Sequence, residues 1–436
     1  MKKILFTLIS LLIICLQSNA QTWSVTELAI MPEPVTNNAV CEGFVNGVPY
    51  VYSFGGLDST KLYSGIHLRS FRYNTQTDTW EQIPDLPDTL GKIAAAANRV
   101  EDTIYIIGGY HVFANGNELS SNKVHRFDVN ANVFLADGAD IPIAIDDHVQ
   151  AVWRDSLIFV VTGWSNTTNV ANVQIYNPYS DVWTAGTSVP SNSDYKSFGA
   201  SGEIIDDTIY YFGGTRIGFN FPAQNNLRKG VINPNDPTQI TWSDTVLDVN
   251  IKGYRMAATT LGSDIFWFGG SDVTYNYNGI AYNGSGGVDP TNRELWYSTV
   301  TKAWDTSFAY NYPMDLRGIA ETNQFRYIAG GMLAGQEVSN KLLQLNYAIT
   351  NTEDIFSHDI VHVYPNPTQN ILNISLKNPT IGNQIKIFTA FGQLIDEFET
   401  SKGQYQINTE NYLSGVYFLQ VVDKNKIASR KFVISK

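Results

Sequence analysis

Ile104-Tyr105-Ile106-Ile107-Gly108-Gly109 is an apolar run that ends in a pair of glycines, and this arrangement recurs along the chain. The second glycines of the successive copies fall at positions 56, 109, 163, 214, 270 and 331, so they are 53, 54, 51, 56 and 61 residues apart. A period of about fifty residues, with four short strands in each unit, is typical of a β-propeller. The other copies are Gly55-Gly56, Gly213-Gly214, Gly269-Gly270, Gly330-Gly331 and the degenerate Thr162-Gly163.

A second regularity follows four of these copies, because two aromatic residues stand seven positions apart. Polar turns such as Glu101-Asp102 and Asp206-Asp207 recur before the apolar runs. Asn, Asp and Gly tolerate the backbone angles that short hairpins need, so each unit is expected to be a four-stranded antiparallel meander. The spaced aromatic pairs are Tyr73 and Trp80, Phe127 and Phe134, Tyr176 and Trp183, and Tyr297 and Trp304.

In its glycine pairs, spaced aromatics and turns, the region 21–348 resembles Kelch repeats. The resemblance implies an all-β fold, a six-bladed Kelch β-propeller. No Trp follows Gly330-Gly331, whereas Trp23 lies near the N-terminus in the context that the missing strand would have. We therefore expect the N-terminal strand to lie beside residues 342–345 and to close the ring, which pairs two otherwise exposed sheet edges.

Residues 1–20 have the features of a secretion signal peptide. Lys2 and Lys3 give a positive start, and Ser18-Asn19-Ala20 is a cleavage site of small residues, so cleavage is expected near Ala20. Residues 4–15 are mostly apolar, but this stretch is too short to span a membrane comfortably.

Loss of the signal peptide changes the formal net charge from −12 to −14, because Lys2 and Lys3 leave with it. A strongly acidic chain disfavours nucleic acid and anionic membranes as main partners. Cys15 follows a bulky residue, which disfavours lipidation, and its removal leaves Cys41 as the single cysteine. Stability is then expected from core burial and ring closure, because no internal disulfide can form.

The last part of the chain is a second module. Residues 349–360 carry no repeat element and are expected to be a linker. In residues 361–436 apolar residues alternate between Asn, Gly and Ser turns, which predicts a small Ig-like β-sandwich. Three phrases follow one another there, Val363-Tyr364-Pro365-Asn366-Pro367, Leu413-Ser414-Gly415-Val416-Tyr417-Phe418 and Lys431-Phe432-Val433-Ile434.

With these phrases in order, residues 361–436 resemble the C-terminal sorting domain of type IX secretion substrates. The resemblance implies a protein that is secreted or held at the outer cell surface, that is not membrane-spanning, and that the type IX secretion machinery handles. An ordinary Ig-like accessory module is the alternative that the alternation leaves open. The sorting motif comprises Pro365, Asn366, Pro367, Gly415, Tyr417 and Lys431.

Loop lengths indicate where a ligand would bind. In a four-stranded meander, the second-to-third connection and the blade-to-blade connection emerge on one face, and the long loops 110–122, 215–229 and 271–292 all lie there. We call it the long-loop face, and loops on a rigid scaffold are the usual sites of recognition. The ligand-binding candidates on it are the basic residues Lys92, His148, Lys196, Arg255 and Arg317 and the aromatic residues Tyr110, Phe221, Tyr275 and Tyr277.

The same residues also have structural interpretations. Basic residues where one blade leads into the next can hydrogen-bond to neighbouring loop carbonyls, and loop aromatics can pack the loops onto the ring. If the ligand is an anionic glycan, Lys92, Arg255 and Arg317 are expected to converge on its carboxylate or sulfate, while aromatic rings stack on sugar faces.

The Kelch resemblance raises two enzyme alternatives, a galactose-oxidase-like copper enzyme and a sialic-acid mutarotase that opens sugar rings by acid–base chemistry. The histidines lack ligand-like spacing, and no phrase singles out the acid–base residues. The sequence therefore favours a non-catalytic binding module for glycan or protein ligands, with no catalytic residue, metal or cofactor assigned. The residues weighed were His67, His111, His125 and His148 for copper, and Glu203, Arg216, Arg317 and Glu321 for acid–base chemistry.

Overall fold

A computed structural model describes residues 22–248, 250–275, 288–322, 324–348, 361–376, 383–389, 394–400, 403–423 and 426–436. The chain divides into two compact units, one spanning Gln21–Ala348 and one that holds Ile349–Lys436. The expected signal peptide, residues 1–20, and the expected linker, residues 349–360, lie outside the described residues.

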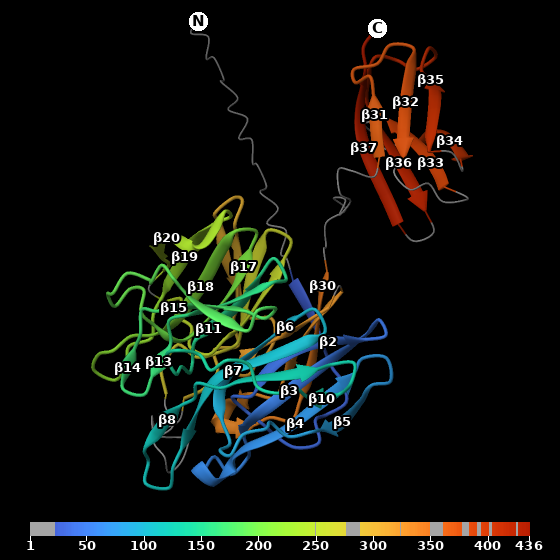
Figure 1. Ribbon diagram of the computed structural model, residues 1–436. Coiled ribbons are helices and arrows are strands. Elements are labelled where there is room, and N and C mark those ends of the chain that lie inside the picture. The colour runs from blue at the N-terminus through green and yellow to red at the C-terminus, as the bar shows by residue number, and fades with distance from the viewer. Residues whose placement is uncertain are drawn as a thin grey trace, which may run out of the picture. The chain divides into compact units, whose positions relative to one another are not determined.

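The larger unit contains, in its described residues, six sheets that are each built on four antiparallel strands (Figure 1), and in one of them β25 (Arg317–Gly318) adds to β2 (Ala39–Val45) in parallel. Sheet 1 comprises β2 (Ala39–Val45), β3 (Val48–Leu57), β4 (Ile66–Asn74) and β5 (Thr79–Ile83). Sheet 2 comprises β6 (Ile93–Val100), β7 (Thr103–Val112), β9 (Val124–Asp128) and β10 (Val133–Phe134), with β8 (Glu118–Ser120) on β7. Sheet 3 comprises β11 (Val149–Trp153), β12 (Leu157–Val161), β15 (Val173–Asn177) and β16 (Val182–Gly186).

The remaining sheets follow the same order along the chain except for the last one. Sheet 4 comprises β17 (Phe198–Ile205), β18 (Thr208–Thr215), β19 (Asn226–Asn233) and β20 (Asp236–Val246), and sheet 5 comprises β21 (Ala257–Leu261), β22 (Asp264–Phe268), β23 (Glu294–Ser298) and β24 (Trp304–Ser307). Sheet 6 comprises β26 (Ala320–Glu321), β27 (Phe325–Ala329), β30 (Leu342–Ala348) and β1 (Thr22–Glu27).

Several short strands and turns lie beside these sheets. They are β13 (Trp164–Ser165) paired with β14 (Thr168–Asn169), β28 (Met332–Leu333) paired with β29 (Glu337–Val338), β25 (Arg317–Gly318) beside β2, and the 3-10 turns η1 (Tyr63–Gly65) and η2 (Ala334–Gln336). None of the helices in the described residues is long and apolar enough to cross a membrane.

The recurring glycines bond each sheet to the next one. In every copy, the backbone N–H of the second glycine donates to a backbone carbonyl in the segment that leads into the following sheet. The copy after sheet 6 bonds to the segment before sheet 1, so the series returns to its start. The six bonds are Gly56 to Lys92 at 3.0 Å, Gly109 to Ile145 at 2.9 Å, Gly163 to Ser197 at 2.8 Å, Gly214 to Gly253 at 2.6 Å, Gly270 to Pro313 at 3.2 Å and Gly331 to Val35 at 2.9 Å.

The first glycine of a pair allows this close approach. A Cβ atom on Gly213 would lie 2.0 Å from the carbonyl oxygen of Gly253, and one on Gly269 would lie 2.0 Å from that of Pro313. Both glycines also have positive φ angles, 70° and 66°, which side chains disfavour. Any other residue at these positions would push neighbouring sheets apart.

Trp23 lies where the sequence predicts it. β1 pairs antiparallel with β30, and Val25 faces Leu345 in the register. The indole of Trp23 is 4% exposed and meets the rings of Phe266 and Phe268 edge-on, at 5.3 and 5.5 Å between ring centroids. In Figure 1 the blue β1 accordingly lies beside the orange β30 at the other end of this unit's sequence.

The C-terminal unit is a β-sandwich of two sheets. One sheet comprises β31 (Val361–Tyr364), β32 (Ile371–Leu376) and β35 (Gln404–Asn408). The other comprises β34 (Leu394–Thr400), β33 (Asn383–Thr389), β36 (Gly415–Asp423) and β37 (Lys426–Ile434). Leu372 and Ile374 of the first sheet share one buried cluster with Ile385, Leu419 and Phe432 of the second.

Deletion of residues 21–33 tests the role of β1. The deletion removes the partner of β30 and leaves an unpaired strand edge, so we expect aggregation at once rather than a small loss of stability. Light scattering and size-exclusion chromatography measure this outcome, with Trp23→Phe as the control that keeps the strand. A deleted chain that stays monomeric and melts at the parent temperature would refute the role assigned to β1.

Candidate functional site

Six backbone turns at or just before the beginnings of the first strands of the six sheets meet one another. Each contains one residue with a positive φ angle, and these residues are linked by backbone hydrogen bonds from sheet to sheet. We call them the central turns. Their positive-φ residues are Asn37, Ala94, Asp147, Gly199, Arg255 and Asp315. The bonds run from the N–H of Ala94 to Asn37, Asp147 to Ala94, Gly199 to Asp147, Arg255 to Gly199, Leu316 to Arg255 and Asn37 to Asp315, at 2.8–3.3 Å.

Arg255 lies between two carboxylates of these turns. Its Nε donates to Oδ1 of Asp147 at 3.0 Å and its Nη1 to Oδ1 of Asp315 at 2.9 Å, while Nη2 donates to Oδ2 of Asp147. The guanidinium is fully buried and lies 5.0 and 5.6 Å from the ring centroids of Tyr254 and Tyr275. Its charge is therefore neutralised inside the protein by residues of sheets 3 and 6.

Arg317 and His148 belong to the same buried network. Nη2 of Arg317 donates to the carbonyl oxygen of His148 at 2.7 Å, and Nη1 lies 3.7 Å from Asp147. Nε2 of His148 lies 3.0 Å from Oε1 of Gln150. Burial, and next the charge of Arg317, lower the pKa of His148 to about 3, so this imidazole is neutral at physiological pH. The structure thus brings Arg255, Arg317 and His148 together, but as parts of one internal network in which both arginines lie beside Asp147.

The aromatic candidates lie in an apolar cluster beside the central turns. Tyr110 is 3% exposed and Tyr275 is 1% exposed. Phe221 packs edge-on against Trp164 at 6.0 Å and Phe198 at 5.8 Å between ring centroids. These three candidates therefore hold loops onto the fold. Tyr277 lies outside the described residues.

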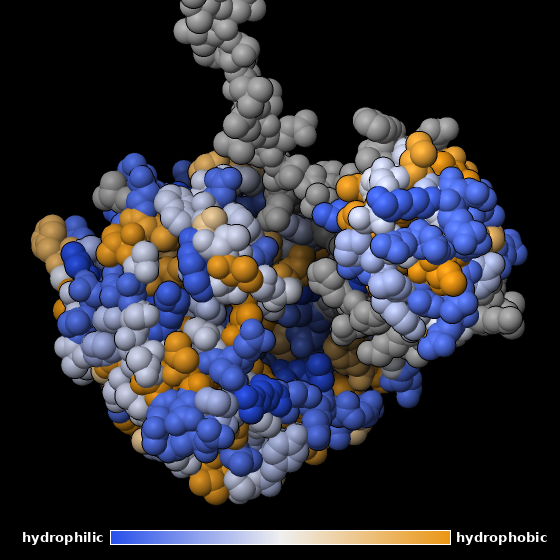
Figure 2. All heavy atoms as spheres, turned by 90° about the horizontal axis from the view of Figure 1, so that it is seen from above, coloured by the Kyte–Doolittle hydropathy of each residue, from blue (hydrophilic) through white to orange (hydrophobic). Residues whose placement is uncertain are grey.

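Exposed apolar side chains occur at other positions of the long loops. Phe219 is 91% exposed and Ile217 is 52% exposed, both in the loop that Phe221 anchors. On the face that Figure 2 shows, the apolar groups are small and hydrophilic residues separate them. The binding candidates chosen from the sequence include Phe221, the partly buried anchor of this loop, and leave out Phe219 at its exposed tip.

Lys92 and Lys196 are separate from the Arg255 network. Nζ of Lys92 bonds to Oδ2 of Asp88 at 2.6 Å, Oγ of Ser121 at 3.2 Å and Nε2 of His125 at 2.9 Å. An ammonium group has three N–H donors, so all three are used internally. Lys196 is half-buried, and its ammonium makes no ion pair with any described residue.

A pocket of about 410 Å³ opens beside Lys92 on the long-loop face. Ligand pockets are commonly about 300–1,000 Å³. Its walls are fixed, because Nδ1 of His111 bonds to the carbonyl oxygen of Gly91 at 2.7 Å and the N–H of Asn166 donates to Oγ of Ser120 at 2.8 Å. We call it the Lys92 pocket. Its lining also includes Asp88, Leu90, Tyr110, Leu119, Asn122, Lys123 and Ala144.

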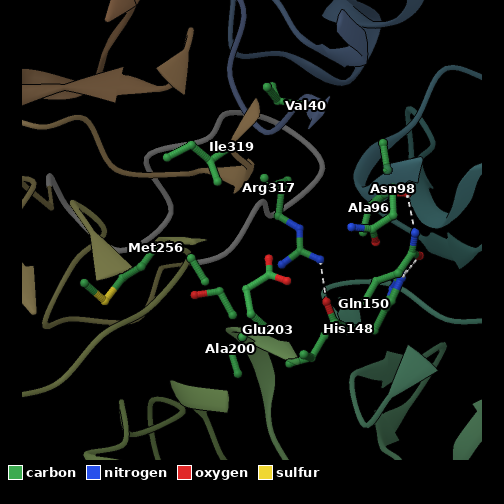
Figure 3. A pocket seen from close by; sticks show the side chains of 16 residues that line it. Val40, Ala96, Asn98, His148, Gln150, Ala200, Glu203, Met256, Arg317 and Ile319 are labelled. Carbon is green, nitrogen blue, oxygen red and sulfur yellow. Dashed lines mark hydrogen bonds between the residues drawn. The ribbon is translucent and has the colours of Figure 1, made fainter. Parts of the chain in front are cut away.

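A second cavity of about 50 Å³ lies among the first strands of the sheets. Glu203 and Arg317 point toward its centre from opposite sides (Figure 3). Burial, followed by the charges of Glu321 and Glu42, raises the pKa of Glu203 well above its usual value. A cavity needs roughly 10–15 Å³ to hold one water molecule, so this one fits a few waters and no sugar ring.

Three carboxylates of these sites were missed by the sequence reasoning, namely Asp147 and Asp315 beside Arg255, and Glu118 near them. A usable signal was present for the first two, because each precedes a basic candidate by one or two residues, His148 and Arg317 respectively. Burial raises the pKa of Glu118 to about 7, although Arg255 opposes the shift.

The residues weighed for copper do not gather. His67 lies in β4, His111 in β7, His125 in β9 and His148 before β11. Across the described ranges, no group of three or more His, Cys, Asp and Glu side chains could hold a metal ion. Cys41 is a free, buried thiol, and burial raises its pKa.

Comparison with known families identifies the C-terminal unit. Residues 362–435 match the family described as "Secretion system C-terminal sorting domain". This part of the chain is therefore a type IX sorting domain, which implies secretion or placement at the outer surface and interaction with the secretion machinery.

Curated relatives include Kelch-like proteins. The chain is 29% identical over 170 residues to Kelch-like protein terF of Aspergillus terreus, which covers 37% of this chain and 35% of that protein. It is 26% identical over 164 residues to mouse Kelch-like protein 35, covering 38% and 25%. A third relative, ulvan lyase NLR42 of Nonlabens ulvanivorans, is 35% identical over 77 residues, 17% of this chain and 14% of that protein. The chain thus spans about a third or less of each relative.

A solved structure supports the propeller fold. The chain resembles "Structure of YjhT" with a TM-score of 0.57 and 15% identity, over 72% of this chain and 96% of that chain. At this identity the likeness shows the fold alone, an all-β propeller.

Replacement of Arg255 should destabilise the protein strongly. Arg255→Ala leaves Asp147 and Asp315 buried without the cation that bonds to both of them, so we expect a loss of about 3–5 kcal/mol in the free energy of unfolding. Arg154→Ala is the control, since Arg154 pairs with Asp207 at the surface and should contribute under about 1 kcal/mol. Denaturant titration measures both, and equal costs would contradict the structural role of Arg255.

Glu118 should make stability depend on pH. Its pKa is about 7 in the folded chain and 4.5 when unperturbed, so its contribution is full below pH 4.5 and is lost as the pH rises through 7. Glu118→Gln should therefore reduce the fall in unfolding free energy between about pH 5 and pH 8 by about 2 kcal/mol. The exposed Glu337→Gln should leave the profile unchanged. Parallel profiles for Glu118→Gln and the parent chain would show that Glu118 does not titrate in this range.

Proposed function

We propose that this chain is a non-catalytic binding protein, exported by type IX secretion, that acts at the outer cell surface or outside the cell. In this proposal residues 1–20 direct export and are removed near Ala20, and residues 21–348 bind the ligand. Residues 349–360 link the ligand-binding part to the sorting domain, residues 361–436. The match over residues 362–435 supports the export route.

We further propose that the six sheets are the blades of one propeller and that β1 closes the ring. Two series of backbone hydrogen bonds support this, one from the glycine pairs and one through the central turns, because each returns to sheet 1. The pairing of β1 with β30 supplies the last strand of sheet 6.

The Lys92 pocket is the observation that carries the binding proposal. It has the volume of a ligand site, lies on the long-loop face and has a lining in which polar groups stand among apolar side chains. Both lysines in its wall are paired, Lys92 with Asp88 at 2.6 Å and Lys123 with Asp140 at 3.0 Å. A neutral ligand therefore suits it, and we propose a glycan whose hydroxyl groups bond to this lining. A protein ligand that presents neutral amides is the alternative.

An anionic glycan held jointly by Lys92, Arg255 and Arg317 gains no support from this geometry. Arg255 and Arg317 share Asp147, whereas Lys92 bonds to Asp88. Each cation already has a carboxylate beside it, so a bound anion would have to displace that carboxylate.

A carbohydrate-active enzyme is the second candidate. One observation favours it, because Glu203 and Arg317 face each other across the central cavity and could act in acid–base chemistry on a sugar (Figure 3). The cavity volume of about 50 Å³ argues against it unless the sheets separate. Anomer exchange followed by NMR, compared between the parent chain and Glu203→Gln, would detect such an activity.

A glycan array probed with the mature chain tests the binding proposal. Ala144→Phe fills the Lys92 pocket and should lower binding of any glycan hit at least tenfold, because the ring occupies the space of the ligand. Ala309→Phe is the matched control in a different pocket, of about 570 Å³, between residues 290–313 and 330–343.

Three outcomes of the array would count against this assignment. Loss of binding only in Ala309→Phe would move the site to the other pocket. Full binding by Ala144→Phe would exclude the Lys92 pocket. An array without hits, together with retained binding of a protein partner, would favour the protein ligand.

A further inference from the structure

The C-terminal sheet formed by β34, β33, β36 and β37 carries an apolar row on its outer face, beside a polar row that includes Lys386 and Glu397. Along β36, Tyr417 and Leu419 point into the sandwich core and are 6% and 0% exposed. Successive side chains of a strand point to opposite faces, so Val416 and Phe418 point outward, at 38% and 40% exposed.

The strand register extends these two residues into a strip. Phe418 faces Phe388 of β33 on one side and Lys431 of β37 on the other, and Phe388 faces Leu394 of β34. Partners in register lie on the same face, so this row crosses all four strands. Val416 faces Val433 of β37 and widens the row. We call Leu394, Phe388, Phe418, Val416 and Val433 the outer strip, and Lys431 borders it.

The opposite sheet has a polar outer face. Leu372 and Ile374 of β32 point inward, which leaves Asn373 and Ser375 outside. Their partners in β35 are Gln406 and Gln404, and Nε2 of Gln406 donates to Oδ1 of Asn373 at 2.8 Å. Ile371, 50% exposed, is the apolar residue at the end of that strand. Tyr364 of β31, the register partner of Asn373, is also exposed there, at 48%. The face of this sheet thus holds two separate apolar residues, whereas the outer face of the four-stranded sheet carries a row of them.

Two residues of the sorting motif, Asn366 and Tyr417, hold the fold and do not form this row. The side chain of Asn366 accepts a hydrogen bond from the N–H of Val433 at 2.8 Å and donates to the carbonyl oxygen of Lys431 at 3.3 Å. The hydroxyl of Tyr417, a buried residue, donates to the carbonyl oxygen of Leu413 at 2.8 Å. These contacts fix β37 and the start of β36, and so fix the strip that crosses them.

The charge of the module differs from that of the propeller. Residues 361–436 hold eight Lys and Arg and five Asp and Glu, a net charge of +3, whereas residues 21–348 hold 19 and 33, a net charge of −14. A basic module with one apolar face matches an apolar surface with acidic surroundings. An acidic surface on the partner would also repel the propeller, because the propeller is negatively charged. The partner is then expected to contact the C-terminal module alone.

We infer that the outer strip is the surface by which the sorting domain docks on the type IX secretion machinery, against an apolar patch with an acidic rim. The inference rests on the proposed export route and specifies which face the machinery contacts. Exposed apolar rows of this kind commonly mark protein–protein contacts.

Export of the full chain in a bacterium with a type IX system tests this inference. Phe418→Ser should lower the amount delivered outside the cell at least tenfold and leave the protein in the periplasm, because it removes the centre of the strip. Ile371→Ser is the matched control, an apolar residue on the other sheet that is 50% exposed against 40% for Phe418, and should be delivered normally. Lys431→Glu should also lower delivery by reversing the charge at the border.

Two further measurements keep the result decisive. Melting curves of the purified chains establish whether the variants fold. If Phe418→Ser does not fold, Leu394→Ser, on a different strand, takes its place in the export experiment. A chain that lacks residues 361–436 separates the two proposals. Normal delivery of that truncated chain would overturn the export route itself. If the truncated chain is not delivered but folded Phe418→Ser and Leu394→Ser are delivered normally, the docking role of the outer strip is overturned. An equal loss of delivery in Ile371→Ser would also overturn the docking role of the outer strip.

Discussion

The structure depends on a close approach between successive sheets, which the glycine pairs make. Six N–H groups of glycines bond to the carbonyls of the segments that lead into the next sheets, at 2.6–3.2 Å. A Cβ at Gly213 or Gly269 would overlap those carbonyls at 2.0 Å. The approach brings the first strands of all sheets together, and with them the turns that contain Asp147, Arg255 and Asp315.

This closeness explains why the centre is filled by the protein itself. Taking a charge out of water is costly unless it is paired and hydrogen-bonded, and Arg255 meets that condition with two carboxylates and two tyrosine rings. The remaining space, about 50 Å³, holds a few waters. Room for a ligand is then found farther out, where the loop 110–122 and the segment 88–92 leave a pocket of about 410 Å³.

The sequence was sufficient to predict features that repeat or stay local. The glycine period, the pairing of Trp23 with β30 and the C-terminal strand alternation each follow from spacing along the chain. Asp147 and Asp315 stand close to basic candidates in the sequence, but their pairing with Arg255 could not be predicted from spacing, because they are 108 and 60 residues away from it and come from other sheets. For the same reason Tyr110 and Tyr275 were expected at a surface, although loops from several sheets bury them together.

In both units, side chains that the sequence offered as recognition residues stabilise the fold instead. In the propeller, the basic residues that were candidates for binding a ligand pair with carboxylates and stabilise the fold. In the sorting domain, Asn366 and Tyr417 likewise stabilise the fold, and the solvent-facing side of the same strands carries the apolar row. The buried cluster of the sorting domain contains only residues from 361 onward. Its outer face therefore does not depend on the propeller core, and a change in a loop such as 110–122 leaves the packing beneath the apolar row unchanged.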